Sequence, residues 1–158
     1  MSTFTHLDEA GRVRMVDVSE KPLTVREATA QAVITMKPET FDMVSQKKTK
    51  KGNVFETARI AGIMAAKKTA ELIPMCHPLN ITNVQIDFVL DPDSASIRAE
   101  GSVRVVGQTG VEMEALTAVS VAALTVYDMC KSYDRAMAIS DVYLLKKSGG
   151  KSGTFVRP

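Results

Sequence analysis

The chain has 158 residues, enough for one compact domain with a buried core, and 45% hydrophobic and 24% charged residues are the usual balance of a soluble globular protein. A formal net charge of +2 gives no general argument for nucleic acid or a membrane as partner. The two cysteines, Cys76 and Cys130, cannot form a disulfide framework, and no run approaches the roughly 20 apolar residues that span a bilayer, so we expect a cytoplasmic protein with free thiols.

The N-terminal third is predicted to contain two strands and a short helix. The alternation in RVRMVDVS predicts an extra strand over residues 12–19. Residues 27–36 alternate with period two and predict a half-buried strand. A helix over residues 38–46 begins with a proline, and the basic loop 47–52 (KKTKKG) follows it.

A longer helix is predicted over residues 54–73. Asn53 precedes it and Glu56 lies three residues further on, which is the spacing of a capping box. Apolar residues then recur at helical spacing until Pro74, which should end the helix.

The second half of the chain is predicted to contain two strands, a long helix and a last strand. Residues 83–91 and 95–107 both alternate, and the turn sequence DPDS between them predicts a hairpin. Residues 110–132 form a long, alanine-rich helix that we expect to be packed on most sides, and residues 138–147 form the last strand.

The order strand, helix, strand, strand, helix, strand predicts an α+β fold. It is the ferredoxin-like βαββαβ sandwich, with an antiparallel sheet and helices packed on one face. No linker divides residues 1–158, so we expect a single domain with flexible termini at about 1–10 and 148–158, the second a polar tail. The fold alone does not identify a function.

The stretch LIPMCHPLN places Cys76 and His77 between Pro74 and Pro78. Adjacent side chains point in different directions, which disfavours a shared metal ion or a nucleophile with its base. Two interpretations stay open. The stretch is either a rigid loop with a buried cysteine, or a binding loop in which His77 contacts a ligand.

Two lysine- and glycine-rich segments are candidate phosphate sites. Residues 146–153 (KKSGGKSG) combine flexible backbone with positive charge but are not a Walker A loop. Residues 47–53 lead into a helix N-terminus, where the dipole favours an anion. Each could equally be a solvated charge run, but together they favour a phosphorylated ligand.

The helix over 110–132 has charges only near its ends. Glu112 and Glu114 can complement the helix dipole, or they can accept hydrogen bonds from the N–H edge of a guanine or pterin. Asp128 and Lys131 share a face, as an ordinary surface pair or as an acid–base couple. We therefore predict a site for a small phosphorylated heterocycle rather than for a polymer.

Three long motifs, IPMCHPL, TGVEMEALTAVSVAALTVYDMCK and LLKKSGGKSG, closely resemble the cyclic pyranopterin monophosphate synthase (MoaC) family of molybdenum cofactor biosynthesis, and further agreement covers nearly the whole chain. The resemblance implies a ferredoxin-like subunit in a homohexamer, a trimer of dimers, with the active site at a dimer interface. It implies a lyase that converts 3′,8-cyclo-7,8-dihydroguanosine 5′-triphosphate to cyclic pyranopterin monophosphate and pyrophosphate by proton transfers. No cofactor or metal centre is implied, and magnesium would come only with the triphosphate.

The resemblance also implies roles for individual residues. Asp128, Lys131 and Lys51 match catalytic positions, with Lys131 the better general acid, because a close carboxylate raises a lysine's pKa, and Lys51 the base candidate. Substrate-binding positions are expected at Met75, Cys76, His77, Met113 and Glu114, with Glu112 beside them, and Asp17 could also face the site. The expected phosphate ligands are Lys21, Arg26, Lys147 and Lys151.

The alternative is a non-catalytic ferredoxin-like module that binds nucleotide or RNA. It would use the same lysines without needing Asp128 or the glutamate pair. A nucleic-acid binder would lose affinity steeply with salt and would normally carry stacking rings, whereas tryptophan is absent and aromatic residues are few.

Overall fold

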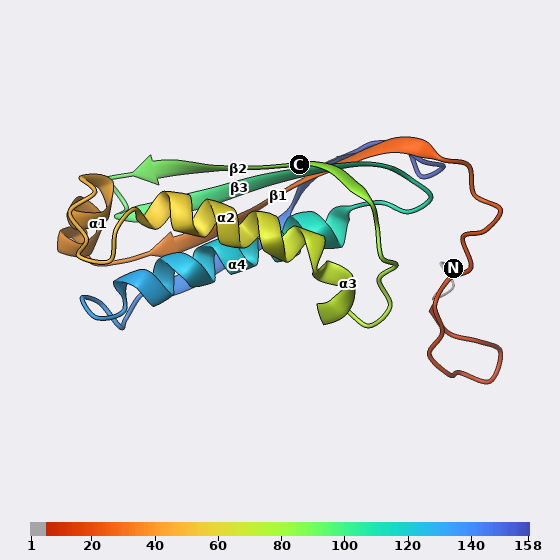
Figure 1. The fold of residues 1–158 in the computed structure, drawn as a ribbon, viewed down its shortest axis with the longest axis horizontal. Coiled ribbons are helices and arrows are strands. Elements are labelled where there is room, and N and C mark those ends of the chain that lie inside the picture. Colours follow the sequence, from red (N-terminus) through yellow and green to blue (C-terminus); the bar gives the residue numbers. More distant parts are fainter. Residues whose placement is uncertain (1–5) are drawn as a thin grey trace.

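The structure, a computed structural model, describes residues 6–158 as an antiparallel sheet with two long helices on one face (Figure 1). The elements in chain order are β1 (Thr24–Thr35), α1 (Pro38–Ser45), α2 (Val54–Lys67), α3 (Thr69–Leu72), β2 (Ile81–Asp91), β3 (Ser96–Gly107), α4 (Glu112–Cys130), β4 (Ala138–Ser148) and β5 (Phe155–Val156). The strand order is β2-β3-β1-β4-β5, so β1 has β3 and β4 as its neighbours. This is the order of a ferredoxin-like sheet with one short added strand, and the predicted fold class is confirmed.

The core lies between the sheet and the helices. The predicted alternation of β1 is confirmed, because Ala28, Ala30, Ala32 and Ile34 are at most 1% exposed. Small residues let α4 lie close to the sheet: a Cβ added at Gly101 of β3 would come within 2.8 Å of Val119 Cγ1. Close packing against such small side chains fixes the position of α4 and of the charges at its ends.

Helix α4 packs on β1, β3, β4 and α2. Within residues 6–158 it is the one helix long and apolar enough to cross a bilayer by length and composition. Half of its apolar window is nevertheless buried inside the fold, as in the core helix of a folded domain. The helix begins near α3, close to the middle of the long axis of the molecule, and ends at the same end of the molecule as α1 (Figure 1).

The strand predicted over residues 12–19 is wrong. The structure records only an isolated bridge between Leu7 and Val13 in this part of the chain. The alternation of apolar and polar residues in MVDVS has another explanation. Val16 and Val18 line a pocket, while Asp17 between them is exposed. The pattern therefore reflects a half-buried extended segment that pairs with no strand of the sheet.

The helix predicted over 54–73 begins as expected but breaks near its end. Asn53 Oδ1 accepts a hydrogen bond from the backbone N–H of Glu56 at 3.2 Å, which confirms the cap. The α-helix ends at Lys67, and α3 follows as a separate turn. Thr69 Oγ1 donates to the carbonyls of Ala65 and Ala66, a local bond that competes with regular helix. The break turns the chain before Pro74.

The segment predicted as a polar tail folds back onto the sheet, so that prediction is wrong in part. Strand β5 pairs with Lys146 and Lys147, and the Arg157 N–H donates to Leu145 O at 2.8 Å. The Arg157 guanidinium lies 4.1 Å from the centre of the Tyr143 ring, a cation–π contact. Flexibility of the two termini stays a prediction.

A glycine turn makes this return possible and gives a testable difference. Gly149 has φ +90°, and an added Cβ would clash with the carbonyl oxygen of Val25, whereas Gly153 has φ +66° and open space around it. Gly153→Ala should cost only the backbone strain, about 1–2 kcal/mol. Gly149→Ala should cost more and release β5. Hydrogen exchange of the Arg157 amide tests this: equal exchange rates in the two variants would contradict the packing argument.

Candidate functional site

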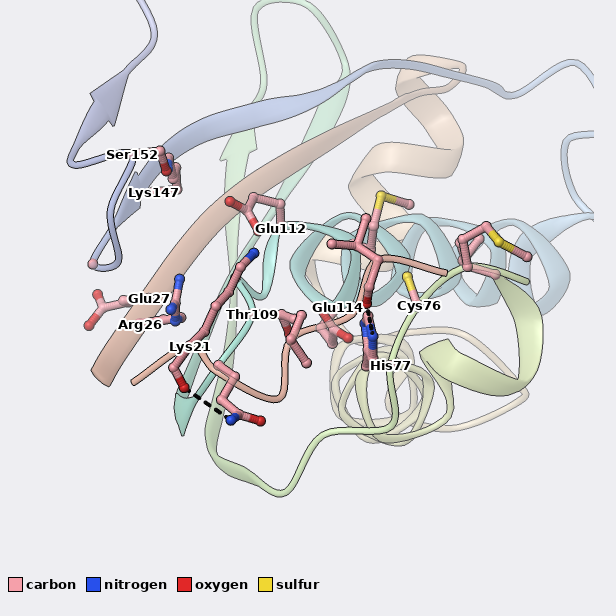
Figure 2. A pocket seen from close by; sticks show the side chains of 18 of the residues that line it. Lys21, Arg26, Glu27, Cys76, His77, Thr109, Glu112, Glu114, Lys147 and Ser152 are labelled. Carbon is pink, nitrogen blue, oxygen red and sulfur yellow. Dashed lines mark hydrogen bonds between the residues drawn. The ribbon is translucent and has the colours of Figure 1, made fainter. Parts of the chain in front are cut away.

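A cavity of about 500 Å³ opens where the start of β1, the end of β4, the β3–α4 turn, the loop after α3 and the N-terminal segment meet (Figure 2). It gathers nine of the residues that the sequence singled out for substrate binding. They are Lys21, Arg26, Met75, Cys76, His77, Glu112, Met113, Glu114 and Lys147. Lys151 is exposed on the adjacent turn, and neither it nor Asp17 lines the cavity.

One end of this pocket is cationic. Lys21, Arg26 and Lys147 come from three different segments and reach into the same region (Figure 2). Arg26 Nε donates to Gly107 O at 2.9 Å, which leaves its terminal N–H groups available, and Lys147 Nζ contacts Ser152 Oγ. A planar guanidinium with free donors beside two ammonium groups suits a polyphosphate.

The other end is formed by the first turn of α4 and the 73–77 loop. Glu114 lies there beside His77, whereas the side chain of Glu112 points away from Glu114, toward the side of the pocket where Lys21 lies (Figure 2). Glu114 is only 4% exposed, and burial, helped by the nearby Glu112 charge, raises the pKa of its carboxyl. Gly110 packs so closely on the Glu112 carboxylate that any side chain at Gly110 would displace it. The pair can accept hydrogen bonds from adjacent N–H groups of a heterocycle.

The loop with Cys76 and His77 is part of the pocket and is hydrogen-bonded to the N-terminal segment. His77 Nε2 lies 2.8 Å from Val16 O, and because a carbonyl can only accept, Nε2 carries the hydrogen. Burial, followed by the charge of Glu114, raises the pKa of the Cys76 thiol, which makes it a poor nucleophile. Among residues 6–158 no three His, Cys, Asp or Glu side chains gather as a metal site would require.

A second cluster lies at the other end of α4. Lys131 Nζ donates to Asp128 Oδ1 at 2.6 Å, and Lys51 Nζ donates to the backbone carbonyl of Asp128 at 3.2 Å. The bond to Lys131 lowers the pKa of Asp128, and the same bond raises the pKa of Lys131. The predicted rise of the Lys131 pKa agrees with this geometry.

The two clusters are far apart within one chain. Glu112 and Asp128 are 16 residues apart on one helix, a rise of about 24 Å. None of Lys51, Asp128 and Lys131 lines the pocket. In a single chain, most of the residues predicted for binding therefore lie together in the pocket. The residues predicted for catalysis lie together in a second, separate cluster.

Sequence reasoning missed several residues of the pocket wall. Gln108, Thr109 and Gly110 form the turn before α4, and Ser152 comes from the turn before β5. Thr109–Gly110 stands directly before the glutamate pair, which is a turn signal that could have been used. Nothing in the sequence links Gln108 or Ser152 to the pocket, because their contacts are with segments far away along the chain.

The burial of Glu114 predicts a pH-dependent stability. Its folded pKa is raised, so the folded chain binds the proton more tightly than the unfolded chain, and this contribution is lost as pH rises from the ordinary value of 4.5 through the raised one. Glu114→Gln should therefore have a higher Tm than the wild type at neutral pH, with the difference vanishing below about pH 4. Thermal unfolding across this range is the measurement. A Glu114→Gln variant that is less stable at pH 7 would contradict the assignment.

Comparison with known proteins shows the family of the chain. Residues 15–150 match the model of the MoaC family. The chain is 64% identical over 156 residues to a protein named cyclic pyranopterin monophosphate synthase from Desulfatibacillum aliphaticivorans, covering 99% of this chain and 98% of that one. It is 62% identical over 156 residues to the protein of the same name from Desulforapulum autotrophicum (strain ATCC 43914 / DSM 3382 / VKM B-1955 / HRM2), covering 99% and 96%. A de novo designed protein with a ferredoxin fold matches with a TM-score of 0.40 at 12% identity, over 75% of this chain and 83% of that one, a likeness too distant to carry an argument.

Proposed function

The chain belongs to the MoaC family, and we propose that it converts 3′,8-cyclo-7,8-dihydroguanosine 5′-triphosphate to cyclic pyranopterin monophosphate and pyrophosphate, a lyase step of molybdenum cofactor biosynthesis in the cytoplasm. The observation that carries the proposal is the set of charges that the pocket gathers. Three cationic side chains, Lys21, Arg26 and Lys147, line it together with the carboxylates of Glu112 and Glu114. A substrate with a triphosphate at one end and a guanine-derived ring at the other matches both.

The proposed orientation of the substrate pairs each of its charged or polar groups with a complementary side chain of the pocket. The triphosphate lies against Lys21, Arg26 and Lys147, where charge-assisted hydrogen bonds are strongest. The ring edge, with its N–H and amino donors, lies against Glu112 and Glu114. The overall reaction changes no oxidation state, so the proposal needs no redox cofactor, and magnesium enters with the triphosphate as its counterion.

Proton transfer is assigned to the second cluster. Lys131 is held in its charged form by Asp128 and acts as general acid, while Lys51 acts as general base. The assignment needs these groups at the substrate, and a rise of about 24 Å along α4 separates Asp128 from Glu112 in one chain. We therefore propose that each complete site combines the pocket of one chain with the Lys51–Asp128–Lys131 cluster of another.

The proposed assembly is a homohexamer, a trimer of dimers, with the active site at the dimer interface. A two-fold interface uses the same surface on both chains, so each dimer would contain two complete sites. Exposed apolar side chains on the outer helices, including Ile60 and Met64 of α2 and Leu124 of α4, are available to such contacts.

A cell-based experiment tests the reaction. A bacterial strain lacking its own enzyme for this step should regain the activity of a molybdenum-dependent enzyme when it expresses the wild-type chain. It should not regain that activity with Glu112→Ala, which removes one carboxylate from the pocket. Failure of the wild-type chain, present at normal abundance, would count against the proposal. The alternative of a non-catalytic nucleotide-binding module would then be tested by the salt dependence of its binding.

A further inference from the structure

Residues 13–23, called here the N-terminal strap, form one wall of the pocket without belonging to the sheet. Val16, Val18 and Lys21 of the strap line the cavity. Within residues 6–158, the Arg14 N–H of the strap donates to His6 O in the preceding segment, and the hydrogen bonds between the strap and the sheet-and-helix body come from two side chains, His77 and Gln108. The placement of Lys21 over the pocket therefore depends on very few contacts.

Gln108 contacts the strap at the residue that carries the charge. Its Nε2 donates to Lys21 O at 3.0 Å and to Ser19 O at 3.3 Å (Figure 2 shows the first bond). The strap presents these carbonyls through a tight turn, in which the Lys21 N–H donates to Val18 O at 2.9 Å and Asp17 Oδ1 accepts from Ser19. One amide thus fixes the backbone on both sides of the turn.

Gln108 itself stands on a rigid support. It follows β3 directly, and the carbonyl of the preceding residue, Gly107, accepts the bond from Arg26 Nε. The same few residues at the end of β3 therefore orient two of the three cationic side chains of the pocket, Arg26 through a backbone carbonyl and Lys21 through the Gln108 side chain.

We propose that Gln108 is a positioning residue that holds Lys21 against the phosphate end of the substrate. The effect on the substrate phosphates rests on the proposed function. The contact between Gln108 and the strap does not, because it is present in the structure without any ligand. Ser19 and Lys21 are exposed, so water can solvate their carbonyls when the Gln108 amide is removed. The fold should survive the substitution, and the strap should lose its register over the pocket.

The test uses Gln108→Met, which keeps the length and neutrality of the side chain and removes only its polar atoms. Gln85→Met is the matched control, because Gln85 bonds to Asp87 on β2 and does not line the pocket. Hydrogen exchange of the Lys21 amide should become about 3- to 10-fold faster in Gln108→Met and should not change in the control. This is the range expected for loss of the neutral hydrogen bond to Lys21 O, the shorter of the two that the substitution removes.

Binding of inorganic tripolyphosphate, measured by calorimetry, supplies the functional arm. Gln108→Met should weaken it by about 3- to 10-fold, and in a Lys21→Ala background the same change should add less than about twofold, because both act through one ammonium group. With the substrate, Gln108→Met should raise KM by a similar factor and leave kcat nearly unchanged.

The proposal would be overturned if the Lys21 amide exchanged at the wild-type rate in Gln108→Met. It would also be overturned if Gln108→Met weakened tripolyphosphate binding by the same factor with and without Lys21→Ala. A wild-type chain that binds tripolyphosphate but makes no product, with the exchange and binding differences intact, would instead remove the proposed reaction and leave the positioning role of Gln108 in place.

Discussion

Replacing Lys51 or Asp128 by alanine should reduce kcat by about 10²- to 10⁴-fold, the range contributed by positioned acid and base groups. Asp128 holds Lys131 through the 2.6 Å bond between carboxylate and ammonium, and Lys51 approaches the same turn of α4. Both losses should appear mainly in kcat, since the proposed role of these residues is proton transfer, whereas the groups proposed to bind the substrate line the pocket.

The matched control for this prediction is Lys48→Ala. Lys48 belongs to the same basic loop and is exposed. Lys48→Ala removes one positive charge, as Lys51→Ala does. Steady-state kinetics of the three variants, with tripolyphosphate binding measured beside them, separates the two effects. Equal losses in Lys48→Ala and Lys51→Ala would mean that the loop acts only through its total charge.

Mixing two inactive variants should restore activity. One carries Lys51→Ala, and the other carries Arg26→Ala together with Lys147→Ala, which removes two of the three cationic side chains of the pocket. If each site takes its pocket from one chain and its lysines from the partner, random mixing through a two-fold interface leaves about a quarter of the sites intact. Each variant alone should have almost no activity.

The mixing experiment requires that the subunits exchange, which native mass spectrometry can verify. Mixed assemblies that stay inactive would show that a site draws all these residues from a single chain. That result would contradict the shared site, and it would require a large movement of α4 or of the loop before it, since the two clusters occupy opposite ends of the helix.

The fold was predictable from the sequence because local signals and the core agree. Ala28, Ala30 and Ala32 alternate in β1 and are buried together, and Asn53 caps α2 as its spacing indicated. Where the prediction failed, a long-range contact decided the outcome. Within residues 12–19, Val16 and Val18 line the pocket, and the segment does not join the sheet. Phe155–Val156 pairs with the edge strand β4.

Nine of the predicted binding residues line one pocket, but the arrangement of the charged groups was not predictable. Charges at both ends of one helix can be read from the sequence, and their separation follows from its length once the helix is known. Sequence gave no signal for Gln108, whose importance arises from two carbonyls 87 and 89 residues away along the chain. Contacts of this kind depend on the tertiary fold.

The most direct measurement is a mass balance of the reaction. The purified wild-type chain is incubated with magnesium and enzymatically prepared 3′,8-cyclo-7,8-dihydroguanosine 5′-triphosphate, and pyrophosphate and cyclic pyranopterin monophosphate are both quantified. We expect equal amounts of the two products from the wild type and almost none from Lys51→Ala. No product from folded wild-type protein, or pyrophosphate without the pyranopterin, would contradict it.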